Sequence, residues 1–147
     1  MFTLVYKSEA AESLNDAEIE KMLQKTKIRN KKRHITGCLV YHEGYFVHLL
    51  EGEEDAVKSL FDKIKIDERH RKISVLSMEE SVLRMFRDWN TIYSKRKDSN
   101  LQEQARKRQL FGDIFHSSNA VISPGNSKLA LWMQVNELLN TNFARLS

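Results

Sequence analysis

The stretch from residue 34 to residue 52, HITGCLVYHEGYFVHLLEG, constrains the fold of this chain more than any other. Residues 38–41 and 45–47 are short apolar runs rich in β-branched and aromatic side chains, and the polar break His42-Glu43-Gly44 separates them. Such runs around a break that contains glycine predict a β-hairpin. The hairpin closes at residues 49–52, and a helical pattern follows it.

The segments around the hairpin complete a β-α-β-β-α-β-β order. Asn15 and Glu18 have the spacing of a capping box, which predicts a helix start there. Val57, Leu60 and Phe61 keep the spacing of one helix face in the second helix, over residues 53–66. The expected strands are 2–7, 38–41, 45–47, 73–76 and 89–93. We therefore expect an α+β, ferredoxin-like fold, with two helices covering one face of a mixed five-stranded sheet.

The composition suits a single globular domain with an added segment. The chain has 147 residues, of which 41% are hydrophobic and 30% charged. It contains no apolar run near the ~20 residues of a membrane span and no signal-peptide pattern. The lone Cys38, inside an apolar run, excludes a disulfide framework within one chain. We expect a cytoplasmic protein without membrane contact.

Basic residues cluster around residues 25–33, around residues 69–72 and in the tail, and they give a net charge of +4. These clusters have two interpretations. They can be solvated surfaces, with cations that interact favourably with helix C-termini. They can also form a binding site for an anion, either a flavin phosphate or a nucleic-acid backbone, although nucleic acid is the less favoured partner.

Residues 96–147 differ in composition from the rest of the chain. They are polar at first, they contain the only proline, Pro124, and they end in an amphipathic segment. We expect a C-terminal helical pair that covers the bare side of the sheet. The alternative is a surface for a partner or for a second copy, and hence a homo-oligomer.

Many short motifs, in order, resemble the BLUF domains, which are bacterial blue-light sensors that bind flavin. The matching pieces are Leu4-Val5-Tyr6-Lys7-Ser8, Arg29-Asn30, Ile35-Thr36-Gly37-Cys38-Leu39, Gly44-Tyr45-Phe46, Leu49-Leu50-Glu51-Gly52, Asp67-Glu68-Arg69-His70 and Phe86-Arg87-Asp88-Trp89. The resemblance spans residues 1–95 and identifies them as a flavin-binding domain. It implies FAD as the cofactor, with FMN as the alternative.

The resemblance also implies roles for single residues. Tyr6 matches the tyrosine that gives an electron and a proton to the photoexcited flavin. Asn30 matches the asparagine that hydrogen-bonds the flavin ring, for which an amide is well suited. Arg29 is expected to reach a carbonyl or phosphate of the cofactor. The expected residues at the phosphate end are Arg69, His70 and Arg71. If the resemblance is set aside, the simplest prediction is that Tyr6 is an aromatic residue of the core and that Asn30 caps the end of the helix.

Two positions depart from the family pattern. His48 stands where the resemblance leads one to expect the photoactive glutamine, and Thr91 stands where many members have methionine, two positions after Trp89. Imidazole has a donor and an acceptor and can bridge Tyr6 and a flavin, but it cannot exchange amide tautomers. We therefore expect an altered or lost photocycle. Because imidazole titrates near neutrality, we expect any photoresponse to vary between about pH 5 and 8.

These observations favour a short BLUF-type sensory protein that passes its signal to a separate protein. The alternative is a flavin-free interaction module with the same fold. An enzyme is not expected, because the residues after the domain are too few for a fused output enzyme. The sequence has no phosphate-loop or dinucleotide motif, and no metal-ligand spacing was found.

Overall fold

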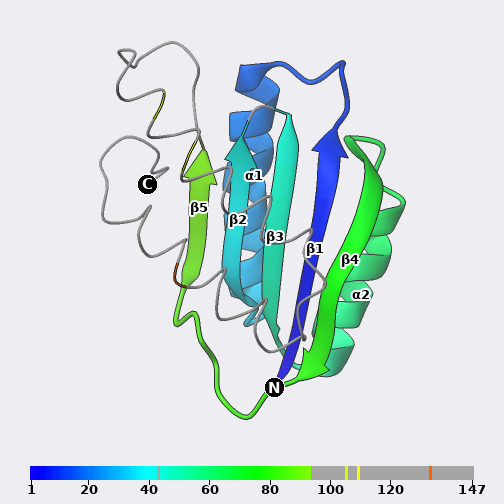
Figure 1. Cartoon of the computed structure of the whole chain (residues 1–147). Coiled ribbons are helices and arrows are strands. Elements are labelled where there is room, and N and C mark those ends of the chain that lie inside the picture. Colours follow the sequence, from blue (N-terminus) through cyan, green and yellow to red (C-terminus); the bar gives the residue numbers. More distant parts are fainter. Residues whose placement is uncertain (43, 94–104, 106–108, 110–132, 134–147) are drawn as a thin grey trace.

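The computed structural model describes residues 1–42 and 44–93, together with residues 105, 109 and 133. Figure 1 shows five strands in one layer with two helices behind them. The elements, in chain order, are β1 (Phe2–Ala10), α1 (Asp16–Lys32), β2 (Thr36–His42), β3 (Tyr45–Gly52), α2 (Glu54–Lys65), β4 (His70–Glu80) and β5 (Trp89–Tyr93). This order confirms the β-α-β-β-α-β-β prediction. Apart from residues 105, 109 and 133, the expected helical pair over residues 96–147 lies outside the described residues.

The sheet is mixed and has the strand order β4-β1-β3-β2-β5. Its neighbours are antiparallel except β2 and β5, which run parallel. Strands β4 and β5 are therefore the two edges (Figure 1). The connection of residues 81–88 joins these edges, so it passes from one side of the sheet to the other.

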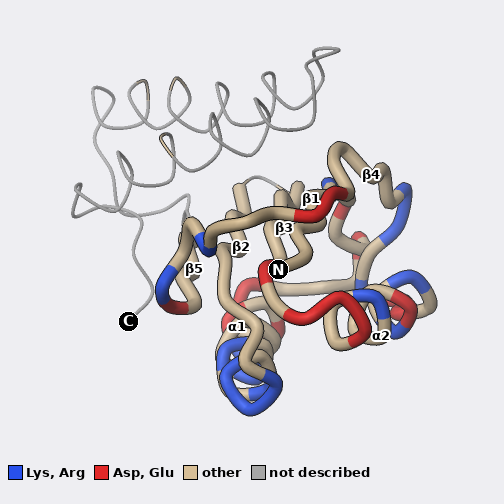
Figure 2. The backbone as a smooth tube through the Cα atoms, turned by 90° about the horizontal axis from the view of Figure 1, so that it is seen from below, with Lys and Arg blue, Asp and Glu red and all other residues tan. Residues whose placement is uncertain are grey.

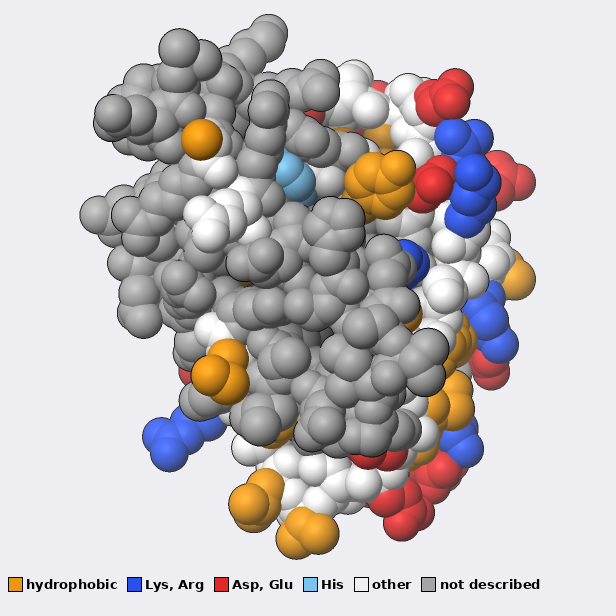
Figure 3. Space-filling view, viewed as in Figure 1, with side chains coloured by type: hydrophobic (Ala, Val, Ile, Leu, Met, Phe, Trp, Pro, Cys, Tyr) orange, Lys and Arg blue, Asp and Glu red, His pale blue; other side chains and the backbone are white. Residues whose placement is uncertain are grey.

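Strand β4 is longer than the sequence predicted, with eleven residues instead of four. Its ends are polar and charged, because an edge strand has much of its surface in water. Charged side chains gather along this edge of the molecule in Figure 3. Arg71 and Lys72 of β4 form ion pairs with Glu9 of the neighbouring strand β1.

Both helices lie on the same face of the sheet (Figure 2). Helix α2 buries the predicted face, Val57, Leu60, Phe61 and Ile64, against β1 and β3. Helix α1 buries Ile19 and Leu23 against the β2–β3–β5 side of the sheet. Farther along the same face of α1 the buried residues are Thr26 and Asn30, which are polar. The core therefore has two apolar clusters with polar groups between the helices.

Local sequence signals explain where these elements begin and turn. The Asn15 side chain accepts a hydrogen bond from the backbone N–H of Glu18 at 2.8 Å, which confirms the predicted helix cap. Gly44 has φ +88° in the tight connection between β2 and β3, a conformation that glycine adopts without strain. Gly37 has φ +137°, and a Cβ atom there would lie 1.9 Å from the carbonyl oxygen of Leu49. Only glycine allows β2 this close approach to β3.

Within the described residues, neither helix is long and apolar enough to cross a membrane.

Candidate functional site

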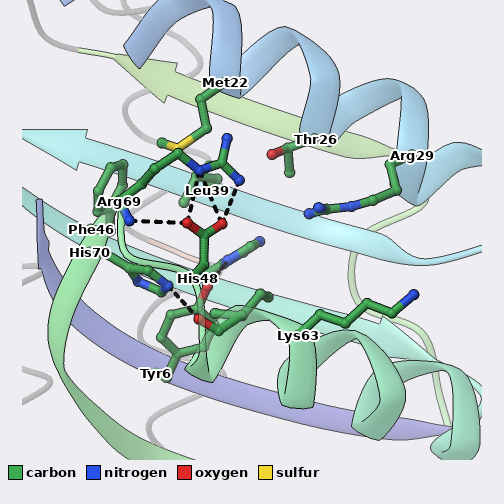
Figure 4. Close-up of a pocket in the computed structure, with 12 residues that line it drawn as sticks. Tyr6, Met22, Thr26, Arg29, Leu39, Phe46, His48, Lys63, Arg69 and His70 are labelled. Carbon is green, nitrogen blue, oxygen red and sulfur yellow. Dashed lines mark hydrogen bonds and ion pairs between the residues drawn. The ribbon is translucent and has the colours of Figure 1, made fainter. Parts of the chain in front are cut away.

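A cavity of about 100 Å³ lies between α1 and α2, above the central strands (Figure 4). Side chains from both helices and from β1, β2 and β3 reach it, together with residues that follow α2. Its lining residues are Tyr6, Met22, Thr26, Arg29, Leu39, Phe46, His48, Lys63, Ile64, Asp67, Arg69 and His70. Five of the nine site residues predicted from the sequence therefore lie together in this lining: Tyr6, Arg29, His48, Arg69 and His70.

Tyr6 and His48 form a hydrogen-bonded pair at the base of this cavity. They are direct partners on the adjacent strands β1 and β3, and the Tyr6 hydroxyl meets the His48 Nδ1 atom. The Tyr6 and His48 side chains are 3% exposed. The expected contact between these two residues is therefore present, and it is closed off from water.

Burial sets the protonation of this pair. It lowers the pKa of His48 to about 3, and the neighbouring Arg29 and His70 lower this pKa further. Burial also raises the pKa of Tyr6. Both groups are therefore neutral, so the Tyr6 hydroxyl donates and Nδ1 accepts, which places the imidazole proton on Nε2. The expectation that His48 titrates near neutrality is wrong, because it took no account of desolvation.

The pair belongs to a row of residues that crosses four strands. In register, Thr91 of β5 lies beside Leu39 of β2, Leu39 beside His48, and His48 beside Tyr6. The Trp89 and His48 rings are 5.1 Å apart and meet at 71°, edge to face. His48 and Thr91, the two positions that the sequence predicted to depart from the family pattern, are thus both buried and share one row.

Several buried polar atoms around the cavity have no hydrogen-bond partner within the described residues. They include Nε2 of His48, Nε of Arg29 and both amide atoms of Asn30. Asn30 is fully buried one turn beyond Thr26 on the same face of α1, just outside the cavity lining. A buried unpaired polar group costs about 1–3 kcal/mol, so this arrangement is unfavourable unless a ligand completes it.

The three residues predicted for a phosphate differ in their availability. Arg69 lines the cavity and is bound to Asp67, and this hydrogen bond lowers the pKa of the Asp67 carboxyl. His70 also lines it, but its ring nitrogens contact the Ser8 hydroxyl and the Ile64 carbonyl. Arg71 lies outside the lining and pairs with Glu9 and with Glu12.

Lys63, Thr26 and Met22 also line the cavity, although the sequence did not predict them as site residues. Lys63 is next to the buried face of α2, and Met22 and Thr26 fall on the buried side of α1. Their helical phase could have indicated them, since residues at the edge of two facing helices line the groove between them. No group of three His, Cys, Asp or Glu residues suited to a metal ion occurs in the described part of the chain.

A comparison with known protein families matches residues 1–92 to the family described as BLUF, sensors of blue-light using FAD. The chain belongs to the BLUF family. The match spans the whole sheet except the last residue of β5, together with both helices and the cavity between them. The resemblance inferred from short motifs is thereby confirmed, and so is the ferredoxin-like fold.

Curated BLUF relatives are larger proteins. The chain is 37% identical over 78 residues to the photoactivated adenylate cyclase subunit alpha of Euglena gracilis, a match that covers 53% of the chain and 8% of the relative. It is 33% identical over 84 residues to the blue light- and temperature-regulated antirepressor BluF of Escherichia coli (strain K12). This match covers 57% of the chain and 21% of the relative. The chain thus matches only a small part of these proteins.

Two solved structures resemble the fold over most of the chain. The BLUF protein BlrB in its dark state is 26% identical, with a TM-score of 0.67, and the match covers 92% of this chain and 96% of that one. A bacterial light-regulated adenylyl cyclase is 33% identical, with a TM-score of 0.65, and the match covers 81% of this chain and 34% of the cyclase chain. BLUF domains bind a flavin as their chromophore and are themselves sensors rather than enzymes.

Proposed function

We propose that residues 1–95 of this chain bind FAD between α1 and α2 and act as a blue-light sensor. The observation that carries the proposal is the set of buried polar atoms without partners on Arg29, Asn30 and His48. The edge of a flavin ring carries carbonyl oxygens and ring nitrogens, which match amide, guanidinium and imidazole groups. Bound flavin would therefore turn unfavourable groups into hydrogen-bonded ones.

The cavity must widen to hold a flavin. Its volume of about 100 Å³ is below the ~300–1,000 Å³ typical of ligand sites. Met22 of α1 and Lys63 of α2 both line it, and both have long, unbranched side chains that can turn outward. Figure 4 shows these two side chains on opposite sides of the groove. Widening it along α1 would bring Asn30 into the lining.

The cations at the cavity suit a cofactor that carries phosphates. Arg69 and Lys63 are exposed lining residues near the end of α2. Arginine's planar fork matches phosphate oxygens, and lysine contributes a point charge. His70 is a poor phosphate ligand, because its ring already contacts Ser8 and Ile64. Arg71 is no better placed, because it is turned toward Glu9.

A bound flavin would supply the absorption of blue light and, once excited, an acceptor for one electron. Tyr6, which lines the cavity, would supply this electron, and a phenol that loses an electron becomes strongly acidic. Its proton would move to the His48 Nδ1 atom, to which the hydroxyl is already hydrogen-bonded. Burial and the nearby charge of Arg29 disfavour a second proton on this ring. The electron and the proton would therefore return to Tyr6 together and quickly, which restores the neutral phenol and stores little of the change.

The output of the sensor passes to a separate protein in this proposal, and the chain has no enzymatic activity of its own. The relatives support a sensory role, since they are named as a photoactivated adenylate cyclase subunit and as a blue light- and temperature-regulated antirepressor. We place the protein in the cytoplasm and infer that it works as a homo-oligomer, for which sedimentation at several concentrations is the test.

The test of the proposal is the absorption spectrum of the purified chain before and after addition of FAD. We expect a yellow protein with flavin bands at one FAD per chain, and quenched flavin fluorescence. Tyr6→Phe should restore part of the fluorescence, because phenylalanine is a poor electron donor. A colourless chain that also fails to take up FAD would overturn the proposal and favour the flavin-free interaction module.

A further inference from the structure

We propose that a second cavity, where α1 ends, binds a small phosphorylated compound of the nucleotide class. Its volume is about 550 Å³, within the ~300–1,000 Å³ of small-molecule sites. It lies between the last turns of α1 and the connection that leads into β5. The lining residues are Lys27, Lys31, His34, Ile35, Thr36, Arg84, Arg87, Asp88 and Trp89. None of them lines the cavity between the helices.

Positive charge from two separate elements meets at this second cavity. Lys27 and Lys31 come from α1, whereas Arg84 and Arg87 come from the connection into β5. Figure 2 shows Lys and Arg positions both on α1 and on the connection into β5. Among the described residues of the lining, Asp88 is the only acidic one. Like charges around a hollow attract an anion, and its binding removes their mutual repulsion.

The helix dipole explains only part of this arrangement. Cations in the last turn of a helix interact favourably with its C-terminal carbonyls, and this accounts for Lys31. It does not account for Arg87, which belongs to another element. Within the described residues, the side chains of Lys31 and Arg87 form no ion pair, so both are available to a ligand.

Arg84 provides a fixed cation at the same place. It is half-buried, and one of its terminal nitrogens donates to the Thr36 hydroxyl and to the carbonyls of His34 and Glu51. These acceptors hold the guanidinium in position without neutralising its charge. Its other N–H groups remain for an oxyanion, which is the geometry that suits phosphate.

An aromatic side chain favours a nucleotide over a simple phosphate. Trp89 lines the cavity and is only half-buried, and the apolar Ile35 lies beside it. An indole ring stacks on nucleobases of any kind, at about 1–3 kcal/mol per base in other proteins. The Trp89 ring also contacts His48. Where the proposed flavin function holds, an occupant would therefore alter the surroundings of the Tyr6–His48 pair.

Calorimetric titration of the full chain with pyrophosphate, ATP and adenosine tests the site. We expect pyrophosphate to bind, ATP to bind more tightly and adenosine not to bind measurably. The double variant Lys31→Gln/Arg87→Gln should weaken binding of both phosphates by about tenfold or more. The matched control is Lys21→Gln/Lys25→Gln, which makes the same charge change elsewhere on α1 and should leave the affinities unchanged.

Absence of heat with pyrophosphate and ATP would overturn the proposal. Equal losses in the double variant and its control would also overturn it, because they would show a response to net charge alone. Competition by added riboflavin, which has the flavin ring but no phosphate, would place the anion in the other cavity and contradict the assignment. The pyrophosphate titration needs no flavin, so it remains decisive even where the chain takes up no FAD.

Discussion

Replacing His48 with glutamine should make the stability of the protein less sensitive to acid. An unperturbed imidazole takes up a proton near pH 6.5, whereas burial holds the pKa of His48 in the folded protein at about 3. Between these values the unfolded chain binds the extra proton and the folded chain does not. The free energy of unfolding therefore falls as the pH is lowered from about 6.5 toward 3, and the full contribution is present above pH ~6.5.

The size of this effect follows from the two pKa values. One pKa unit corresponds to about 1.4 kcal/mol, so at about pH 4.5, two units below the unfolded value, His48 lowers the free energy of unfolding by about 3 kcal/mol. Glutamine does not titrate, and its amide can still accept the hydrogen bond from Tyr6. The His48→Gln variant should therefore not lose these ~3 kcal/mol of unfolding free energy at about pH 4.5.

The assay is urea unfolding followed by circular dichroism at about pH 7.5 and about pH 4.5. The quantity compared is the loss in the free energy of unfolding between the two pH values. Carboxylates contribute equally to this loss in both proteins, so the difference between the two losses reports His48 alone. The control His34→Gln removes an exposed imidazole and should leave this loss as it is in the unmodified protein. Equal losses for His48→Gln and the unmodified chain would refute the reasoning.

Three further predictions concern light, backbone geometry and a buried carboxylate. Blue illumination of the FAD-loaded chain should give no lasting red shift, because the His48 ring cannot turn toward the flavin without leaving Tyr6, whereas His48→Gln should show the shift; a normal shift in difference spectra with His48 in place would contradict this. Gly37→Ala should lower the free energy of unfolding by about 3 kcal/mol or more, since its new Cβ meets a β3 carbonyl at positive φ. Gly44→Ala, which meets no atom within 4 Å, should cost about 1 kcal/mol, and equal thermal shifts for the two would show that the contact is harmless. Glu51→Gln weakens the bonds to two backbone N–H groups of the β4–β5 connection and should speed their hydrogen exchange; unchanged exchange would rule out that role.

The sequence predicts the fold well where local signals agree with the tertiary structure. The hairpin follows from two apolar runs around a glycine, and Asn15 marks the start of α1 because its side chain can satisfy a free backbone N–H. The buried face of α2 follows from the spacing of Val57, Leu60 and Phe61. The length of β4 does not follow, because the polar ends of an edge strand give no alternating pattern.

The site could be predicted in outline but not in detail. Tyr6 and His48 come together through the register of β1 and β3, and residue spacing along one strand does not show that register. The low pKa of His48 depends on burial by both helices. Arg69 and Arg71 are two positions apart, yet only Arg69 lines the cavity. The second cavity also depends on tertiary structure, because it joins α1 to a connection more than fifty residues later.

The affinity of the chain for FAD with and without the Asn30 amide tests the central claim most directly. Asn30→Ala removes buried polar atoms that have no partner in the described structure. Its stability without FAD should therefore be unchanged or higher, while its affinity for FAD should fall by about tenfold or more. Gln24→Ala, an exposed amide on the same helix, should leave both unchanged. Equal affinities for FAD in the two variants, or a chain that takes up no FAD, would contradict a flavin site between α1 and α2.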